Sequence, residues 1–177
     1  MTLVELVIVL MMLGILTTVA SPQLLSSIES ARLDAVTSEV VTAHQFAQSS
    51  AMASGRPCRV RVDAITETVT LEQVQYTKLT DILNVANTQL VAADVETSTA
   101  YAAMKHPLRR TTSYTVDFKA VTWFSGINIV SVVYGTGSNV VYDGQGAPST
   151  GAVVTLAYGD RQAVVSVSSS TGAVTVQ

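Results

Sequence analysis

The sequence predicts an α+β chain in which one long N-terminal α-helix packs on an antiparallel β-sheet domain. Three observations support this prediction. Residues 1–20 are almost wholly apolar, and apolar residues then recur at three- and four-residue steps as far as Ala51. From Cys58 onward the period becomes two, and glycine-containing turns separate β-branched runs. A single change of period near residue 55 therefore divides the chain into a helical part and a β-rich part.

The composition limits the function classes. The 177 residues suffice for one domain plus an anchor. Charged residues make up only 13% of the chain, which suits a protein that buries surface against copies of itself. The net charge of −3 argues against a surface that binds nucleic acid in general. Cys58 is the only cysteine, so an intramolecular disulfide is excluded.

Residues 1–20 have the length of a membrane span. At ~1.5 Å per residue they form a rod of roughly 30 Å, which equals the hydrocarbon thickness of a bilayer. Glu5 interrupts this run, and a charge at membrane depth costs about 2.5–3.5 kcal/mol or more unless it has a partner. The amine of Met1 is the nearest candidate partner. It lies on the same helical face as Glu5, or it comes from a second copy shifted along the axis.

These residues resemble a known family. Residues 1–6, MTLVEL, resemble the mature N-terminus of type IV pilins and of the pseudopilins of type II secretion. The resemblance implies that a leader peptidase creates this terminus, that Met1 becomes N-methylated, and that Glu5 guides subunits onto the filament base. Gly14 and Pro22 match positions where helices of this family bend or melt. Pro22 also predicts a kink or a melted turn on its own chemistry.

Two other interpretations of the N-terminus fit the sequence less well. A secretory signal peptide would be cleaved after Ala20, but a basic n-region is missing and Glu5 interrupts the apolar run. A plain anchor helix would not need Glu5. We therefore expect residues 1–24 to form a transmembrane or filament-core half-helix, and residues 25–177 to form a pilin globular domain.

Residues 25–54 predict an amphipathic half-helix that lies against the sheet. Its apolar stripe is Val36, Val40, Ala43, Ala47 and Ala51, and its wetter side carries Arg32, Asp34, Thr37, Ser38 and Glu39. Ser54-Gly55-Arg56-Pro57 supplies the stop, because glycine favours the residue past a helix end and proline cannot continue the helix.

Residues 58–177 are predicted to be β-rich. Cys58, Val60 and Val62 alternate with arginines, and residues 66–71 alternate again after a turn at Asp63-Ala64. Residues 75–110 predict a variable, surface-exposed insertion with a short helix over Asp81–Ala93. The later strands are expected at Tyr114–Phe118, Ile127–Tyr134, Val140–Tyr142, Val153–Tyr158, Ala163–Val167 and Ala173–Val176.

Two segments narrow the resemblance. A helix that ends near SGRP and is followed by CRVRVD is similar to minor pilins and pseudopilins of the GspH/FimT-like type. The run YDGQGAP at residues 142–148, followed by a strand pair and TGAVTV at residues 171–176, resembles the C-terminal half of these domains.

We expect no enzyme activity, no cofactor and no metal site. The sequence has no metalloprotease, CxxC, phosphate-loop or nucleophile-elbow motif. His44 follows a stripe position and is expected at a polar boundary, and Cys58 is expected to be a buried structural thiol. Asp143-Gly144 is interpreted as a turn, because calcium requires six or more oxygen ligands. The hydroxyl-rich residues 166–171 indicate either an exposed hairpin end or a glycan attachment surface.

Basic residues form two clusters in the sequence: Arg56, Arg59 and Arg61, and then Lys105, Arg109 and Arg110. Some minor pilins of this type bind DNA, and phosphate binding requires several such charges on one face. Alternatively, the charges guard exposed strands against mispairing. The acidic net charge and the absence of charged side chains in residues 162–177 favour the second interpretation.

The resulting functional prediction is a structural subunit of a type IV pilus-like or type II secretion pseudopilus filament. The alternative is a minor pilin that acts as a DNA-uptake or adhesive binding module. The resemblance implies a helical filament of like subunits or other pilins, the bacterial inner membrane before assembly, an assembly platform, a motor ATPase and a prepilin peptidase. It places the mature protein in a periplasmic pseudopilus or an extracellular pilus, and we do not expect nucleic acid as a partner.

Overall fold

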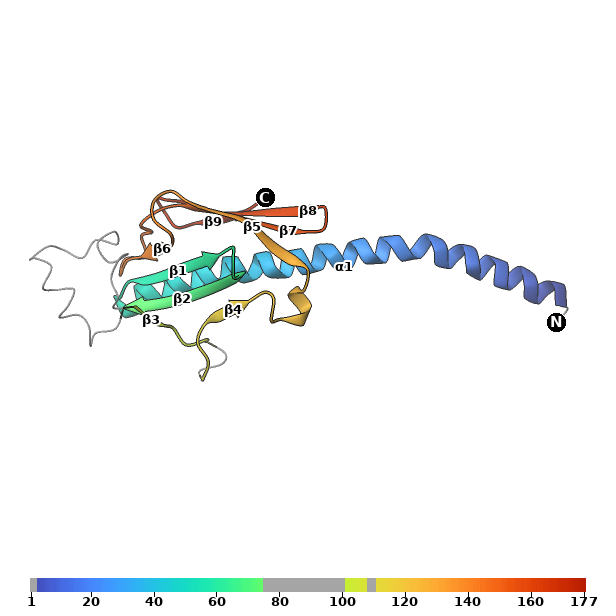
Figure 1. Ribbon diagram of the computed structural model, residues 1–177, viewed down its shortest axis with the longest axis horizontal. Helices are drawn as coiled ribbons and strands as arrows, with labels where there is room; N and C mark the ends of the chain where they lie inside the picture. The colour runs from blue at the N-terminus through green and yellow to red at the C-terminus, as the bar shows by residue number, and fades with distance from the viewer. Residues whose placement is uncertain (1–2, 75–100, 108–110) are drawn as a thin grey trace, which may run out of the picture.

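The computed structural model describes residues 3–74, 101–107 and 111–177, and describes residues 16–26 by their backbone alone. Met1, the helix predicted over Asp81–Ala93, and Arg109 and Arg110 lie outside the described residues. The fold is α+β, as predicted. Figure 1 shows one long helix whose C-terminal half is covered by β-sheets and whose N-terminal half protrudes.

Helix α1 (Leu3–Ser54) is 52 residues long and runs without interruption through Gly14 and Pro22. The melted turn predicted at Pro22 is therefore wrong for this structure. A proline removes one backbone hydrogen bond of the helix, and the other bonds of a long helix persist around it. Figure 1 shows only a gentle curve of the protruding half. The helix ends as predicted, because Gly55 adopts φ +65, and Pro57 follows.

The C-terminal half of α1 carries the core of the domain. All five residues of the predicted apolar stripe, Val36, Val40, Ala43, Ala47 and Ala51, are fully buried. Thr37 was expected on the wet side but is buried, and its hydroxyl donates to the Leu33 carbonyl at 2.7 Å. Small stripe residues allow two sheets to approach the helix closely. One sheet contacts the helix through the strands β1 (Cys58–Asp63), β2 (Thr68–Val74) and β6 (Val140–Tyr142). The other contacts it through β7 (Ala152–Tyr158), β8 (Arg161–Val167) and β9 (Val174–Val176).

The first sheet has five strands in the described part of the chain. They are β1 (Cys58–Asp63), β2 (Thr68–Val74), β3 (Tyr101–Ala103), β4 (Thr115–Asp117) and β6 (Val140–Tyr142). Their order is β3-β2-β1-β6, and β4 pairs with the other end of β2. The sequence did not predict β3, because three residues are too few to show a period and they fall in the expected variable insertion. Alternation along β1 is confirmed, since Cys58, Val60 and Val62 are buried.

The second sheet has four antiparallel strands in the order β5-β7-β8-β9. They are β5 (Ile127–Tyr134), β7 (Ala152–Tyr158), β8 (Arg161–Val167) and β9 (Val174–Val176), close to the predicted bounds. A 3₁₀-helix, η2 (Thr122–Phe124), precedes β5 and was not predicted.

A tyrosine joins the two sheets where β6 stops pairing with β1. The strand β6 covers only Cys58 to Val60 of β1, which leaves the edge at Val62 without a neighbouring strand. The Tyr134 hydroxyl, from β5 of the other sheet, accepts the Val62 N–H at 2.9 Å and donates to the Val62 carbonyl at 3.2 Å. One side chain therefore replaces a strand at the split between the sheets.

Glycine turns fix the C-terminal end of α1. The side-chain amide of Gln48 donates to the Gly146 carbonyl at 2.8 Å and to the Thr171 carbonyl at 3.0 Å. A Cβ atom at Gly144 would lie 3.0 Å from the Gly55 carbonyl oxygen, and one at Gly172 would lie 2.8 Å from the Tyr142 ring. The glycines of the two C-terminal sequence motifs are therefore required because both turns press on the same end of the helix.

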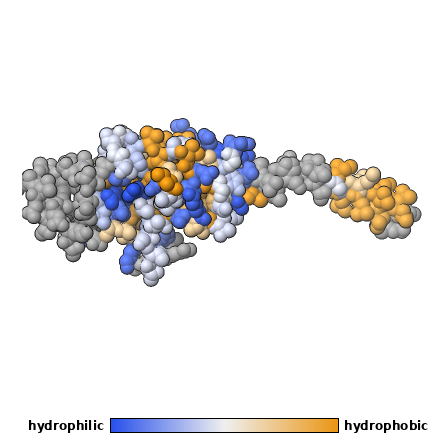
Figure 2. Space-filling view, viewed as in Figure 1, coloured by the Kyte–Doolittle hydropathy of each residue, from blue (hydrophilic) through white to orange (hydrophobic). Residues whose placement is uncertain are grey.

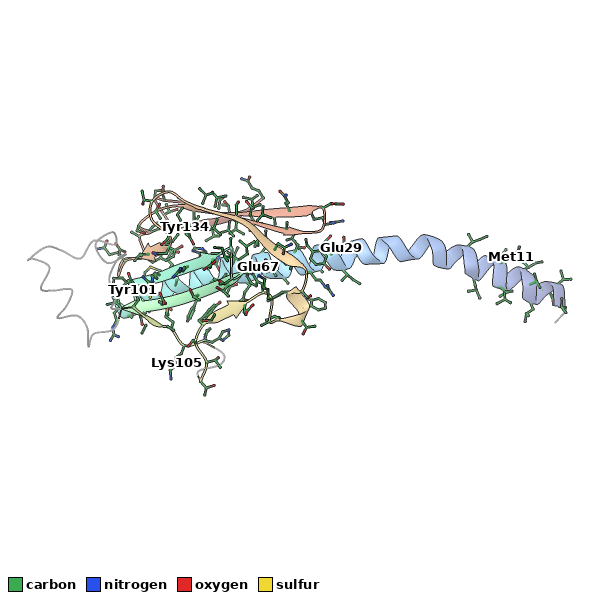
Figure 3. The ribbon with its side chains drawn as sticks, viewed as in Figure 1. Met11, Glu29, Glu67, Tyr101, Lys105 and Tyr134 are labelled. Atoms are coloured by element: carbon green, nitrogen blue, oxygen red, sulfur yellow. The ribbon has the colours of Figure 1, made fainter. Side chains whose placement is uncertain are left out.

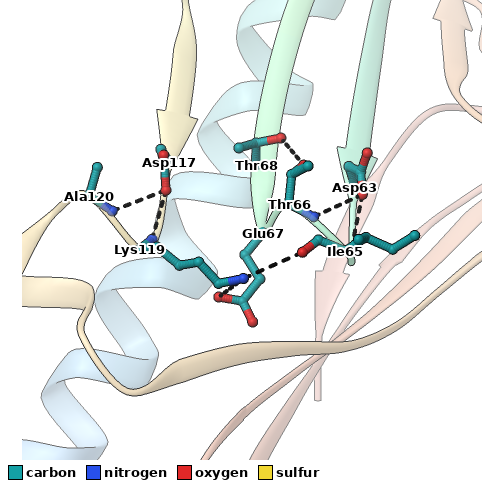
Figure 4. Close-up of polar contacts among 8 residues, drawn as sticks. All are labelled: Asp63, Ile65, Thr66, Glu67, Thr68, Asp117, Lys119 and Ala120. Atoms are coloured by element: carbon teal, nitrogen blue, oxygen red, sulfur yellow. Dashed lines mark hydrogen bonds and ion pairs between the residues drawn. The ribbon is translucent and has the colours of Figure 1, made fainter.

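The turn between β1 and β2 is held to the segment after β4 (Figure 4). The Asp63 carboxylate accepts the backbone N–H groups of Ile65 and Thr66, which lower the pKa of that carboxyl. Glu67 has φ 55, and its Oε2 lies 3.7 Å from the Nζ of Lys119. The Asp117 carboxylate caps the next turn by accepting the N–H groups of Lys119 and Ala120. These contacts hold the β1–β2 turn and the segment after β4 in one arrangement.

A glycine pair tests whether contact with the helix end sets the cost of substitution. Gly172 and Gly159 both have positive φ, but only Gly172 has neighbours within 4 Å of a built Cβ. Gly172→Ala should lower the free energy of unfolding by at least about 2 kcal/mol, because strain and a clash with Tyr142 and Gln48 add. Gly159→Ala should cost about 1 kcal/mol from strain alone. Equal losses in denaturant unfolding would show that the helix contact contributes nothing.

Candidate assembly surface

The protruding half of α1 exposes apolar side chains around its whole circumference. The exposed set comprises Leu3, Val4, Leu6, Val7, Ile8, Val9, Leu10, Met11, Met12, Leu13 and Ile15. The values reach 80% at Leu3 and 69% at Met11, and Figure 2 shows this end of the rod as a continuous apolar surface. A helix that is apolar on all sides must be buried in protein or lipid to be stable. We call residues 3–15 the apolar rod.

Glu5 is the one charged residue of the apolar rod. It lies in the first turn of α1 as the structure describes the helix, where the positive end of the helix dipole favours a carboxylate. Because Met1 lies outside the described residues, pairing of Glu5 with an amine stays a prediction. In the part of the chain that the structure describes, no helix has a stretch long and apolar enough to count as a membrane span.

The predicted basic clusters are spread over different elements. Arg59 contacts the Glu72 carboxylate, and its guanidinium lies 4.1 Å from the centre of the Tyr101 ring. Arg61 is exposed two residues further along β1, whereas Lys105 lies in the loop after β3 (Figure 3). Arg56 is half-buried just after the end of α1. The charge of Arg59 is therefore balanced by Glu72 on the neighbouring strand of the same sheet.

Cys58 and Asp143 have structural roles. Burial raises the pKa of the Cys58 thiol to about 11, and the Gln73 amide donates to its sulfur at 3.3 Å. The prediction of a buried thiol is confirmed. One Asp143 oxygen accepts the N–H groups of Gln145 and Ala147, as in an ordinary turn. Nowhere in the described ranges do three metal-ligating side chains gather.

His44 lies in the core, so its predicted position at a polar boundary is wrong. Its Nδ1 lies 3.0 Å from the Tyr142 hydroxyl, and its Nε2 has no hydrogen-bond partner among the residues that the structure describes. Burial lowers the pKa of His44 to about 4 and raises that of Tyr142. The helical periodicity did not predict this burial because His44 lies one residue after the stripe position Ala43. His44 is buried because Tyr142, from β6, packs against it.

Sequence reasoning also missed Arg32, Trp123 and Tyr158, which meet at the base of the domain. The Arg32 guanidinium lies 5.5 Å from the Trp123 ring centre and 5.8 Å from the Tyr158 ring centre. Its Nη1 donates to the Tyr158 hydroxyl at 2.9 Å. The only sequence signal was that the sole tryptophan of the chain stands between two predicted strands.

Comparison with known proteins identifies the family. Residues 36–171, more than half of the chain, match the model of the family described as type II transport protein GspH. The chain belongs to the GspH family. No curated protein matches the sequence. The matched range begins at Val36 and therefore excludes the apolar rod.

Solved structures show the same fold. Two structures of the minor pseudopilin EpsH from the type II secretion system of Vibrio cholerae are similar to this chain. The first has a TM-score of 0.54 at 12% identity, covering 82% of this chain and 96% of EpsH. The second has a TM-score of 0.55 at 11% identity, covering 82% and 93%. The type IV minor pilin FimU of Pseudomonas aeruginosa has a TM-score of 0.48 at 14% identity, covering 84% and 90%.

Membership in the GspH family supports a role as a subunit of a type II secretion pseudopilus, a filament that forms with other pseudopilins in the periplasm. Members of this family are structural subunits, so the expectation that the chain is not an enzyme is confirmed.

The burial of His44 predicts a loss of stability in acid. The folded-state pKa of about 4 lies below the usual histidine value of 6.5, so the unfolded chain binds more protons between these values. Stability should therefore fall as the pH drops from 6.5 towards 4, by about 3 kcal/mol in total. His44→Asn should remove this part of the pH dependence in urea unfolding. Tyr142→Phe should keep it, because burial and not the hydroxyl lowers the pKa; loss of the slope in Tyr142→Phe would contradict that cause.

Proposed function

We propose that the GspH-family chain polymerises by bundling the apolar rod with the rods of neighbouring subunits. Residues 1–24 hold it in the bacterial inner membrane as a single span before assembly, and residues 25–177 form the periplasmic domain. The observation that carries the proposal is the exposed apolar surface of residues 3–15, which continues without a break into a helix whose apolar stripe is fully buried from Val36 to Ala51. Such a rod requires either lipid or other rods around it.

Transfer from lipid to a helix bundle gives little hydrophobic free energy. Lipid tails are as apolar as leucine, so packing and polar contacts decide whether helices associate in a membrane. The apolar side chains of the rod, such as Leu3 and Met11, therefore have almost the same free energy in lipid as in a helix bundle. The free energy that differs between lipid and a helix bundle is that of a charged side chain, which lipid cannot stabilise.

Glu5 supplies that difference. An unpaired carboxylate at membrane depth costs about 2.5–3.5 kcal/mol. Pairing with the amine of Met1 in a neighbouring subunit would recover this free energy only in the assembled state. Because the two groups are about one helical turn apart in sequence, the pair would also fix the axial offset between neighbours.

Further partners follow from the type of filament. We propose a prepilin peptidase, a motor ATPase and an assembly platform. Bends at Gly14 and Pro22 would be features of the assembled filament, since α1 is continuous at both residues here.

A DNA-uptake or adhesive role is less well supported. Arg59 contacts Glu72, and Arg61 and Lys105 belong to different elements, so the described basic residues do not form one phosphate-binding face.

Replacement of Glu5 tests the assembly mechanism. Glu5→Ala should reduce the yield of sheared filaments roughly a hundredfold, because about 2.5–3.5 kcal/mol of pairing free energy is lost. Membrane insertion of the variant should persist or improve. The measurement is the amount of subunit in the sheared fraction and in the membrane fraction.

Asp34→Ala is the matched control. Asp34 is an exposed carboxylate on the same helix but outside the apolar rod, and its loss should leave the filament yield unchanged. Normal filaments from Glu5→Ala would disprove the pairing, and equal defects in both variants would point to a general effect of charge.

A further inference from the structure

Two segments lie beside α1 where the helix leaves the domain (Figure 1). They are the segment from β4 through η2 to β5, and the β7–β8 turn. The helix contacts η2, Arg32 lies between Trp123 and Tyr158, and Arg161 after the β7–β8 turn donates to the Ser30 hydroxyl. We call Ile28, Arg32, Val121, Trp123 and Tyr158 the base collar.

The base collar presents large apolar side chains to the outside. Trp123 is 54% exposed, Val121 39% and Ile28 38%. Tryptophan is usually among the most buried residues on average, yet no residue of η2 is buried. These side chains are on ordered backbone, because Ile28 belongs to α1 and the Asp117 carboxylate caps the turn that leads to Val121.

The chemistry of the base collar matches a membrane interface. Tryptophan and tyrosine concentrate at headgroup level, where an apolar ring meets a polar atom, and arginine extends its charge from apolar surroundings into the headgroups. Arg32 is stacked between two such rings, and the Tyr158 hydroxyl accepts its N–H. The side chains are therefore arranged as amphipathic groups around the point where the apolar helix emerges.

The length of the helix places the base collar at that level. From Leu3 to Ile28 the helix rises about 37 Å at ~1.5 Å per residue, whereas the hydrocarbon core is ~30 Å thick and the whole bilayer ~40–45 Å. With the rod across a membrane, the base collar falls in the headgroup region of one leaflet.

We propose that the base collar seats the domain on the phospholipid headgroups of the membrane before the subunit enters the filament. This inference rests on the membrane stage of the proposed function. The seat fixes how deep the rod lies in the bilayer and how the domain is oriented above it.

Apolar and aromatic contact, not net charge, drives this seating. Lys119 is paired with Glu67 at 3.7 Å, and Arg161 follows the exposed Asp160. Glu29 lies half-buried next to Ile28. With charges of both signs present, contact with lipid should survive high salt.

The sole tryptophan makes the seat directly measurable. The full chain is reconstituted into vesicles of phosphatidylethanolamine and phosphatidylglycerol, and insertion is verified by flotation. Trp123 emission should move to shorter wavelength than in detergent-free filaments stripped of lipid. Lipids brominated close to the headgroup should quench it more strongly than lipids brominated at the chain ends, and high salt should not reverse this.

A relocated tryptophan is the matched control. Trp123→Phe combined with Gln145→Trp puts the fluorophore on an exposed turn beside the C-terminal end of α1, far from the base collar. Its emission should be insensitive to brominated lipid.

The outcomes separate the two proposals. If the chain does not float with the vesicles, the membrane stage of the proposed function is wrong and the seat falls with it. If the chain inserts but Trp123 remains unquenched, the seat alone is overturned. A shift of Trp123 to shorter wavelength only in assembled filaments would also overturn it, because a neighbouring subunit would then be what covers the base collar.

Discussion

One helix in two surroundings is the constraint on which this structure depends. From Val36 to Ala51, α1 presents valines and alanines that two sheets bury completely, whereas from Leu3 to Ile15 it exposes leucine, valine, isoleucine and methionine on every side. The backbone is continuous between the two halves. Free energy gained by packing in the first half therefore holds the second half in a helical conformation outside the domain, where it needs a partner.

The packed half also has to hold the domain in one orientation on the helix. Gln48 donates to two loop carbonyls, Gly172 is in contact with both Gln48 and Tyr142, and Tyr142 meets His44 in the core. These contacts join the C-terminal turns to a single helical turn of α1. At the other end, Arg32 holds η2 and the β7–β8 turn. Fixed at both ends, the domain has one orientation on the packed half of α1.

Periodic features of this fold could be predicted, and contacts through space could not. The stripe on α1, the stop at Gly55 and the second sheet follow from spacing and turn residues, because each depends on neighbours in sequence. The position of His44 depends on Tyr142, 98 residues away, and the exposure of Trp123 depends on Arg32 from another element. Where the two sheets separate, the Tyr134 hydroxyl bonds the edge of β1 at Val62, 72 residues away in sequence. No local sequence pattern predicts this contact. The same holds for the candidate sites. Glu5 could be predicted because its neighbours in sequence are apolar, whereas the base collar could not, because its residues come from separate elements.

The apolar middle of the rod cannot decide when the subunit leaves the membrane. Its side chains are satisfied in lipid and in a helix bundle almost equally, so the free-energy difference between the two states must come from the ends of the rod. At one end Glu5 favours the state that offers it an amine. At the other, Trp123 and Arg32 favour the state that offers a polar–apolar boundary. During extraction from the membrane, the two ends of the rod would then act in opposite directions. The base collar would hold the domain at the bilayer until the free energy of pairing at Glu5, together with work from a motor, exceeds the free energy of contact with the headgroups. If both proposals hold, a subunit with this arrangement would stay in the membrane by default and would leave it only at a growing filament base, which is the behaviour that controlled polymerisation requires.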